Sequence, residues 1–409
     1  MCDFALQDDV YLVQGAKKHA IYDFNKSRLY NINQSTLRFI RNCISKRINF
    51  GLFSTAETES LDCLLKNEIL IPTEKIKPEV TIESKYPSEN NSLKSAWIEV
   101  TNICNLKCKH CYSPENNNPL GSMDYKTFSK VVFELSSIGV EHVQIIGGEP
   151  LILKDKIKKM LLLSKNFFKT VKLWTNATLI DKDWAIFFSE NRIVVNTTIF
   201  SYSSVEHDKV TRYPDSHSKT HQAIGHLKDA GCEYLVNCVR MNGVEIENKR
   251  TDLYDLHKRC DVVRNCGRAD LGLLNKELLY KKLITKQTFS KPLLHNLSKL
   301  LVSGHNCFSK NIYISQDQNL YPCPMERKIH YGSLKEDKLS TIIKNAVIIS
   351  KSVISICKHC EYRYACVDCR PDRLEDDIYA KPWYCTYDPY TAEWFSPEEF
   401  VVSKMSHLN

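Results

Sequence analysis

Apolar residues in the first 75 positions follow first the period of strands and then that of helices. Short alternating runs bounded by polar turn residues are typical of strands. Apolar residues that recur every three or four positions are typical of the buried face of a helix. The expected elements are strands at 10–13, 20–24 and 69–71 and helices at 35–44 and 57–66. This order predicts a small winged-helix-like domain over residues 1–75.

Residues 76–95 lack this regular spacing and are rich in proline, serine and asparagine, which predicts a linker. Beyond them, buried-strand and amphipathic-helix patterns alternate. The expected strands are 143–146, 170–174, 193–199 and 234–239, and the expected helices are 123–138, 157–164, 183–189 and 219–230. Repeated strand–helix units predict an α/β domain over residues 96–300, with a parallel sheet and right-handed crossovers. Ligands of such sheets bind at the carboxyl ends of the strands.

Length, composition and net charge limit the class of protein to which the chain can belong. The 409 residues, 43% hydrophobic and 25% charged, are typical of a globular chain that is long enough for two or three domains. The first residues lack the pattern of a signal peptide, and no apolar run is long enough to span a bilayer, so we expect a cytoplasmic protein without a membrane partner. The net charge of +8 permits an acidic peptide or nucleic-acid partner without requiring one.

The chain has 17 cysteines, and in a reducing compartment clustered cysteines indicate metal binding rather than disulfides. Cys104, Cys108 and Cys111 lie on one polar loop directly after an alternating, β-branched run. Three thiolates can hold three irons of a cubane cluster and leave the fourth iron open to a reacting ligand. A structural zinc loop is the alternative, although zinc loops usually supply cysteines in pairs.

A second set of cysteines follows in residues 301–409. A hairpin is expected at 312–321, with a turn at 317–319 and a cysteine near each end. The seven cysteines of this region are Cys307, Cys323, Cys357, Cys360, Cys366, Cys369 and Cys385. Two Cys-x-x-Cys pairs would also suit a zinc ribbon, but zinc would leave Cys307, Cys323 and Cys385 without a role.

The loop Cys104, Cys108, Cys111, followed by Tyr112, resembles the signature of radical S-adenosylmethionine (SAM) enzymes. The resemblance implies a partial (β/α)6 TIM-like barrel that binds a [4Fe-4S] cluster and SAM. Further segments resemble the SAM-binding motifs of that family, and their residues are Gly147, Gly148, Glu149, Pro150, Asn176 and Thr198. By this resemblance the Gly-Gly-Glu-Pro backbone meets the amino group of SAM, Asn176 lines the site, and Thr198 lies near the ribose.

Two positions depart from the family pattern of the core. Ala177 replaces the glycine of a Thr-Asn-Gly-Thr segment. After the His207-Asp208 pair, Thr211 stands where the family often has an arginine, and Arg212 is one place over. The contact of an arginine with the SAM carboxylate is therefore in doubt.

The seven C-terminal cysteines resemble the SPASM extension, which implies two auxiliary iron–sulfur clusters. By this resemblance Cys357, Cys360, Cys366 and Cys385 hold the outer cluster, and Cys307, Cys323 and Cys369 hold the inner one. Cys266 is a candidate for the fourth inner ligand. The extension's hairpin glycine is replaced by Gln318, and the last cysteine pair is separated by two residues rather than three.

Residues 1–75 are similar to the PqqD-like peptide-recognition domains of many radical SAM maturases, in which a leader peptide adds as a strand to a sheet edge. The resemblance implies that the chain abstracts hydrogen from a ribosomally synthesised precursor peptide and installs a thioether or carbon–carbon crosslink. It also implies an electron donor such as flavodoxin or ferredoxin, and nucleic acid is not expected as a partner.

Other outcomes stay open at this stage. Epimerisation would need a hydrogen donor, for which Cys232, Cys238 or Cys260 are candidates. A sulfatase-maturing-type oxidase would not need the N-terminal domain. A redox-sensing DNA-binding regulator would use a winged helix but would leave the Gly-Gly-Glu-Pro segment unexplained.

Overall fold

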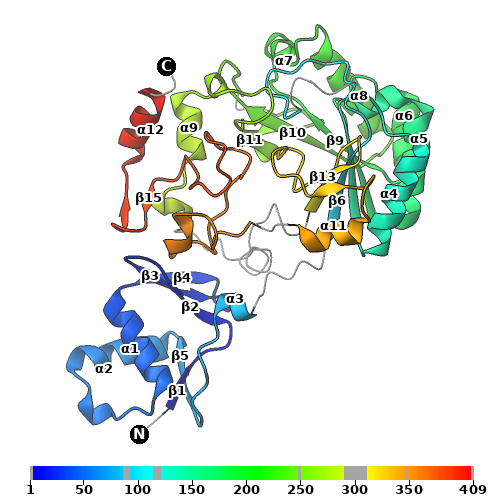
Figure 1. Ribbon diagram of the computed structural model, residues 1–409. Coiled ribbons are helices and arrows are strands. Elements are labelled where there is room, and N and C mark those ends of the chain that lie inside the picture. Colours follow the sequence, from blue (N-terminus) through cyan, green and yellow to red (C-terminus); the bar gives the residue numbers. More distant parts are fainter. Residues whose placement is uncertain are drawn as a thin grey trace.

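The computed structural model describes residues 3–85, 93–113, 121–246, 250–289, 311–346 and 349–406. Cys307 therefore lies outside the described residues. These ranges form a small N-terminal unit and a larger α/β body (Figure 1).

The N-terminal unit contains two small antiparallel sheets and two helices. Its elements are β1 (Asp3–Leu6), β2 (Val10–Gln14), β3 (His19–Asp23), β4 (Arg28–Ile32), α1 (Gln34–Ser45), α2 (Thr55–Lys66) and β5 (Leu70–Thr73). Strand order is β2-β3-β4 in one sheet, and β1 pairs with β5 in the other. Both helices start at a capping residue, because Asn33 accepts from the Thr36 amide and Ser54 forms a capping box with Glu57.

The α/β body is built on a nine-stranded sheet with the order β11-β10-β9-β8-β7-β6-β12-β13-β14. Its strands are β6 (Ser95–Glu99), β7 (His142–Ile146), β8 (Thr170–Trp174), β9 (Val194–Thr198), β10 (Tyr234–Arg240), β11 (Cys260–Val262), β12 (Asn311–Ile314), β13 (Asn319–Tyr321) and β14 (Gly332–Ser333). Strands β6 to β11 are parallel and follow the chain in order, which confirms the expected partial barrel.

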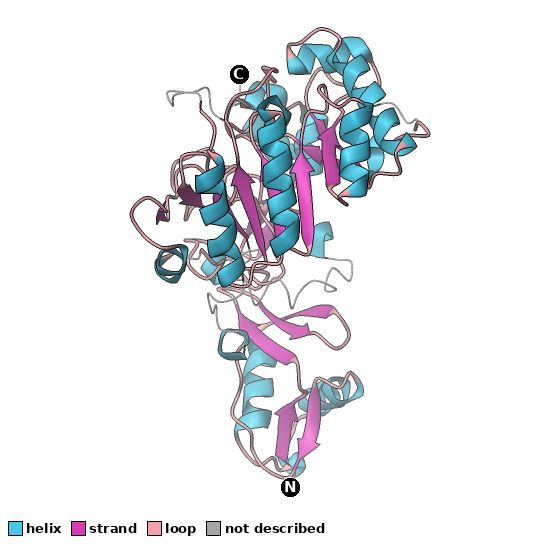
Figure 2. Cartoon of the chain, turned by 90° about the vertical axis from the view of Figure 1, so that its right-hand side faces the viewer, coloured by secondary structure: helices cyan, strands magenta, loops and turns pink. Residues whose placement is uncertain are grey.

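Helices cover the outer face of this sheet, and Figure 2 shows them lying against the strands. They are α4 (Tyr125–Ser137), α5 (Asp155–Phe167), α6 (Lys182–Glu190), α7 (Ser204–Thr211) and α8 (Ser216–Asp229). Val171 and Leu173 of β8 are fully buried in the apolar core that these helices help to form. Because side chains alternate along a strand, Lys172 and Trp174 lie on the opposite, inner face of the sheet.

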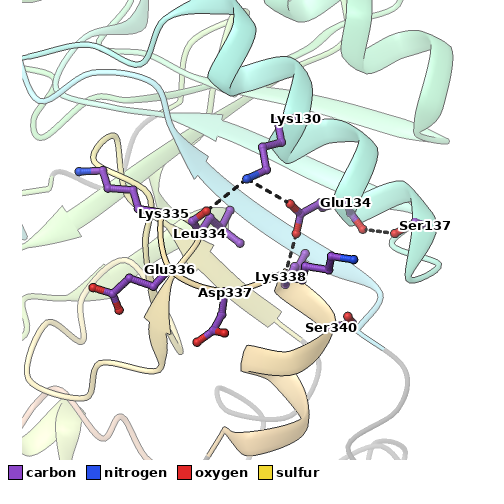
Figure 3. Close-up of a pocket in the computed structure, with 10 residues that line it drawn as sticks. Lys130, Glu134, Ser137, Leu334, Lys335, Glu336, Asp337, Lys338 and Ser340 are labelled. Atoms are coloured by element: carbon purple, nitrogen blue, oxygen red, sulfur yellow. Dashed lines mark hydrogen bonds and ion pairs between the residues drawn. The ribbon is translucent and has the colours of Figure 1, made fainter.

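The C-terminal hairpin is present as expected, but β12 also pairs in parallel with β6. The cysteine-rich region therefore shares one sheet with the core. Its helix α11 (Leu339–Asn345) begins beside α4, where the Glu134 carboxylate accepts the Leu339 amide at 2.7 Å and Lys130 donates to the Leu334 carbonyl at 3.3 Å (Figure 3). The negative charge of Glu134 suits the amino end of a helix.

The remaining elements are α3 (Ile82–Lys85), α9 (Lys276–Lys282), β15 (Tyr387–Asp388), β16 (Glu393–Trp394) and α12 (Pro397–Ser406). Helix α3 lies inside the stretch that the sequence assigns to a linker, and Ile82 is buried there. None of the described helices is both long and apolar enough to cross a membrane.

The sheet β2-β3-β4 packs on its second face against residues 359–365 of the C-terminal region (Figure 1). The Tyr22 hydroxyl donates to the Glu361 carbonyl at 2.8 Å, and the Ala16 amide donates to the His359 carbonyl at 2.8 Å. The ring of Tyr364 packs among apolar side chains of β2 and β3. The N-terminal unit is therefore attached to the segment that joins Cys360 to Cys366.

Candidate functional site

The loop of Cys104, Cys108 and Cys111 follows β6 at the carboxyl edge of the parallel strands. Burial raises the pKa of Cys108 to about 12, and the neighbouring thiols of Cys111 and Cys104 contribute to the same increase. The three thiols thus lie close enough to interact electrostatically. The Leu106 amide donates to the Cys104 sulfur at 3.4 Å. Donors of this kind stabilise a thiolate, which is the form that binds metal.

The end of α7 fixes the outer side of this loop. The Lys107 amide donates to the Thr211 carbonyl at 3.1 Å, and the Lys109 amide donates to the Val210 carbonyl at 2.9 Å. Thr211, which stands at the family's arginine position, thus supports the loop with its backbone. Arg212 forms the C-cap of α7 in the left-handed conformation, with φ at 54°.

A different cation, Arg268, lies at the cysteine loop, and the sequence analysis did not identify it. Its amide donates to the Cys111 carbonyl at 2.8 Å. Its positive charge acts to lower the pKa of Cys108, against the larger effect of burial. The only signal in the sequence is its place directly after Cys266-Gly267.

Gly147 and Gly148 lie directly against the backbone of the cysteine loop. The Gly148 amide donates to the Thr101 carbonyl and the Glu149 amide to the Ile103 carbonyl, both at 2.7 Å. A Cβ at Gly147 would lie 2.6 Å from the Thr101 oxygen, and one at Gly148 would lie 2.2 Å from the Ile103 oxygen. Only glycine allows this approach. The two motifs that the sequence analysis identified separately therefore form one structure.

The Glu149 side chain is fully buried and makes its bonds within the protein. Its carboxylate accepts the Leu151 amide at 3.0 Å, the Thr175 hydroxyl at 2.8 Å and the Asn176 amide at 2.7 Å. Burial raises its pKa to about 7, although these bonds oppose the increase. Glu149 thus joins the ends of β7 and β8, and Pro150 starts the short 3-10 turn that follows.

Asn176 lies beside the first cysteine of the loop. Its amide nitrogen donates to the Asn105 side chain at 2.8 Å and lies 4.0 Å from the Cys104 sulfur. Ala177, the next residue, has φ at 64°, in the left-handed region. This explains why the resembling motif carries glycine at this position.

The inner face of the sheet presents half-buried aromatic and polar side chains next to this loop. The rings of Trp97 and Trp174 lie 5.5 Å apart, and the Trp174 indole donates to Gln144 at 2.8 Å. Thr198 is half-buried at the end of β9. Tyr112 is close to Glu99, since burial and the charge of Glu99 are the main causes of its raised pKa. This face can hold an aromatic and polar ligand beside the three cysteines.

The cysteines predicted for the outer cluster lie together. Cys357, Cys360, Cys366 and Cys385 line one small, apolar cavity. Burial raises the pKa of Cys366 to about 11, with a further contribution from Cys357. The ammonium of Lys351, also at this cavity, is buried and paired with Asp368 at 2.7 Å. A buried cation there balances part of the negative charge that several thiolates would bring.

Cys323 and Cys369, predicted for the inner cluster, lie together with Cys266. The charge of Cys369 is the largest contribution to the raised pKa of Cys323 after burial. Both thiols also raise the pKa of Cys266. In the ranges that the structure covers, no three His, Cys, Asp or Glu side chains have the close geometry of a site for one metal ion. In a cubane cluster each thiolate binds a different iron, so its cysteines do not need the close geometry of ligands to one metal ion.

The candidate hydrogen donors lie away from the inner face. Cys232 is buried in the core between sheet and helices, where its sulfur contacts the Ile193 carbonyl at 3.5 Å. Cys238 packs against Ile224 of α8 and is in register with Cys260 on the neighbouring strand. These positions do not favour a role for Cys232 or Cys238 in epimerisation.

Comparison with known proteins agrees with this arrangement. Residues 98–256 match the family model of the Radical SAM superfamily. The chain is 27% identical over 206 residues to the antilisterial bacteriocin subtilosin biosynthesis protein AlbA of Bacillus subtilis, covering 50% of this chain and 44% of that protein. It is 30% identical over 167 residues to a GTP 3',8-cyclase of Clostridium botulinum, covering 40% and 52%. The chain thus spans about half the length of these relatives.

Solved structures share the fold over more of the chain. The structure of anSMEcpe with bound AdoMet and a Cp18Cys peptide has a TM-score of 0.55 at 22% identity, covering 76% of this chain and 98% of that one. The structure of Streptococcus suis SuiB bound to the precursor peptide SuiA has a TM-score of 0.50 at 12% identity, covering 92% and 99%. The SuiB match covers 92% of this chain, so the residues outside it are fewer than those of the N-terminal unit. The match therefore includes at least part of that unit.

Proposed function

We propose that this protein, a radical SAM enzyme built like the SPASM-type peptide maturases, modifies a ribosomally synthesised precursor peptide. It abstracts hydrogen from one residue of the peptide, and a crosslink or similar modification follows. The observation that carries this proposal is the attachment of an N-terminal unit with an open strand edge to the cysteine-rich end of a radical SAM fold. The SuiB structure, which shares the fold along most of the chain, is a complex with a precursor peptide.

In this proposal Cys104, Cys108 and Cys111 bind a [4Fe-4S] cluster, and the inner face next to them binds SAM. The residues present fit that group, since three interacting thiols share one loop, and Gly147 and Gly148 pack closely against the backbone of that loop. When bound, the cluster and SAM supply a 5′-deoxyadenosyl radical.

The chain's own residues position this chemistry. Gly147 and Gly148 bring the end of β7 against the loop, and the buried carboxylate of Glu149 joins that end to β8. Asn176 orients its amide beside Cys104, and Tyr112 and Thr198 border the same face. The aromatic rings of Trp97 and Trp174 exclude water there, which protects a reactive species from side reactions.

The C-terminal cysteines supply the sites for two auxiliary iron–sulfur clusters. Cys357, Cys360, Cys366 and Cys385 form the outer set, and Cys323 and Cys369 belong to the inner one, for which the sequence also predicts Cys307. Crosslink formation leaves one electron to be removed from the peptide, so an electron acceptor is needed near the core. The outer and inner cysteine sets are the two places where this chain can hold such an electron acceptor. A reduced flavodoxin or ferredoxin is the expected electron donor.

The leader of the precursor peptide binds at β4. Within the described residues β4 pairs only with β3, so its second edge has open backbone donors and acceptors. An extended peptide can add there as a further strand of the β2-β3-β4 sheet. Since that sheet contacts residues 359–365, a peptide bound to it lies near the segment that joins Cys360 to Cys366.

The test is anaerobic reconstitution with iron and sulfide, followed by SAM and dithionite. We expect 5′-deoxyadenosine from the wild type. A Cys104→Ala/Cys108→Ala/Cys111→Ala variant should form none while it keeps iron in its C-terminal half. A wild type that is fully loaded with iron and forms no 5′-deoxyadenosine would contradict the radical SAM chemistry.

A further inference from the structure

One lysine is buried at the cavity of the four outer cysteines. Lys351 lines this cavity together with Cys357, Cys360, Cys366 and Cys385, and its side chain is only 1% exposed. Burial raises the pKa of Cys366 to about 11, and the positive charge of Lys351 is the largest effect that opposes the increase. Lysine is rarely buried so completely, because its ammonium loses its hydration. The ammonium thus faces the thiols rather than solvent.

The ion pair of Lys351 with Asp368 does not neutralise this position. The Asp368 carboxylate, at 2.7 Å from the Lys351 ammonium, also pairs through its second oxygen with the buried guanidinium of Arg370. Arg370 donates further to the carbonyls of Ile378 at 3.0 Å and Ala380 at 2.8 Å, which carry no net charge. Two buried cations thus share one buried carboxylate, and a net positive charge remains. A buried charge of this kind is costly unless an anion lies beside it.

Two other charged side chains at the outer cysteines are opposite in sign. Burial raises the pKa of Cys385, and the charge of Lys381 opposes this increase. Burial also raises the pKa of Cys360, and the charge of Glu361 adds to that increase. Arg363, which also lines the cavity, is paired with a carboxylate of α3. The excess of positive charge at the cavity therefore comes from the buried lysine and its neighbours.

Aromatic side chains limit the access of water to this cavity. Tyr362, Tyr387 and Trp394 line it, with ring centroids 5.2 Å apart for the two tyrosines and 4.5 Å apart for Tyr387 and Trp394. Because a charge in such surroundings is screened less than a charge in solvent, its effect on a neighbouring group is larger. Lys351 can therefore act strongly on a group that the four thiols hold.

We propose that the ammonium of Lys351 raises the reduction potential of the iron–sulfur cluster bound by the four outer cysteines. This inference rests on the proposed function, because it takes the outer set to hold a cluster. On reduction the cluster gains one electron, which in the proposed reaction leaves the peptide radical as the crosslink forms, and its net charge becomes more negative by one unit. A fixed cation nearby stabilises the more negative state, since net charge and burial set the potentials of such clusters. The lysine thus favours transfer of that electron to the outer cluster.

The experiment measures the midpoint potential of the outer cluster in the full-length, reconstituted protein. A redox titration without peptide is followed by electron paramagnetic resonance, and the signal that Cys385→Ala lacks is assigned to the outer cluster. Lys351→Met removes the positive charge, Lys351→Arg keeps it, and Asp368→Asn removes a negative charge from the same ion pair. Lys358→Met is the matched control, because Lys358 lies between two of the outer cysteines in the chain but is exposed to solvent, which screens its charge.

At a fixed potential, we expect Lys351→Met to lower the ratio of reduced to oxidised outer cluster about tenfold, a shift of about 59 mV for one electron. Asp368→Asn should shift the midpoint in the opposite direction, while Lys351→Arg and Lys358→Met should match wild type. The signal that responds to SAM should keep its midpoint in all of these variants, which shows that the core is folded.

Equal midpoints in Lys351→Met and wild type would overturn the inference, and so would shifts of the same sign in Lys351→Met and Asp368→Asn. If Lys351→Met does not retain the outer cluster, the midpoint of Asp368→Asn decides, since it must rise for the inference to hold. Unchanged iron in Cys385→Ala would instead contradict the outer cluster of the proposed function, and this inference with it. None of these readouts needs a peptide, so failure of the maturase proposal is seen separately.

Discussion

Two residues at positions where the motifs they resemble carry glycine have the backbone conformation that glycine favours. Gln318 has φ at 73° in the turn between β12 and β13, and Ala177 has φ at 64° after β8. For a residue with a Cβ this region costs about 1–2 kcal/mol. The unexpected residues in the two motifs therefore preserve the turns and add strain.

We expect Gln318→Gly to stabilise the protein by about 0.5–1 kcal/mol, since relief of strain exceeds the added entropy of the unfolded chain. Gln318 is half-exposed, and its backbone bonds to Ser315 and Leu334 remain. Ala177→Gly is the control, because loss of a fully buried methyl offsets the same relief. Anaerobic urea unfolding measures both variants. A midpoint of Gln318→Gly at or below that of wild type would contradict the role of strain.

His207 is a buried histidine whose ring must stay neutral in the folded protein. Burial and the nearby His217 lower its pKa to about 4, against an opposing effect of Asp208, and its Nδ1 accepts the Phe200 amide at 3.3 Å. The unfolded chain binds this proton near pH 6.5, so the unfolded state gains protons first as the pH falls.

Stability should therefore decrease between pH 6.5 and about pH 4, by an amount on the order of 2–3 kcal/mol from His207 alone. In His207→Gln this part of the pH dependence should be missing. Urea unfolding at several pH values gives the slope for both proteins. Equal slopes would show that His207 does not titrate in this way.

At the scale of elements, Asp208 of α7 caps the next helix. Its carboxylate accepts the Asp215 amide at 2.8 Å, the His217 amide at 2.9 Å and the Ser216 hydroxyl at 2.8 Å. The N-cap residue of α8, Asp215, makes no side-chain capping bond itself. The His-Asp pair seen in the sequence thus includes a capping residue.

We expect Asp208→Ala to destabilise the protein by about 1–3 kcal/mol, because three donors at the start of α8 lose their acceptor. Asp208→Asn keeps one oxygen and should lose less. Thermal unfolding measures the order wild type, Asn, Ala. An Ala variant as stable as wild type would mean that water replaces the carboxylate at no cost.

The sequence predicted the type of most elements but not their long-range partners. Helices and strands of the core follow regular apolar spacing, and β8 has the predicted bounds of 170–174. The pairing of β12 with β6 was not predictable, since strand order depends on tertiary contacts. For the same reason the role of Glu149 was missed, because its three partners lie on two segments. The four-residue strand β1 is too short to show a recognisable alternation of apolar and polar residues.

At the scale of the whole molecule, the N-terminal unit depends on the C-terminal region for one face of its sheet. All five residues of β3 are buried, because α1 packs on one side and residues 359–365 on the other. The N-terminal unit and the outer cysteine set are therefore mechanically connected.

Removal of one hydroxyl should weaken this connection. In Tyr22→Phe the Glu361 carbonyl loses its buried donor, which costs about 1 kcal/mol and should speed local opening about fivefold. Tyr30→Phe is the control, because the Tyr30 hydroxyl has no hydrogen-bond partner among the described residues. Hydrogen exchange at β2 and β3 is the measurement. Equal exchange in the two variants would show that the hydroxyl does not hold the interface.

The radical that we propose forms at Cys104, Cys108 and Cys111 takes hydrogen from a peptide. To measure this transfer, the enzyme is given a perdeuterated precursor peptide. The peptide is the product of a short open reading frame beside the gene, selected because it binds residues 1–85 of the protein. SAM and dithionite are then added, and the 5′-deoxyadenosine is weighed by mass spectrometry. We expect that it gains one deuterium and that the peptide mass changes in the same reaction. Unlabelled 5′-deoxyadenosine from the fully loaded enzyme with this peptide bound would contradict the claim.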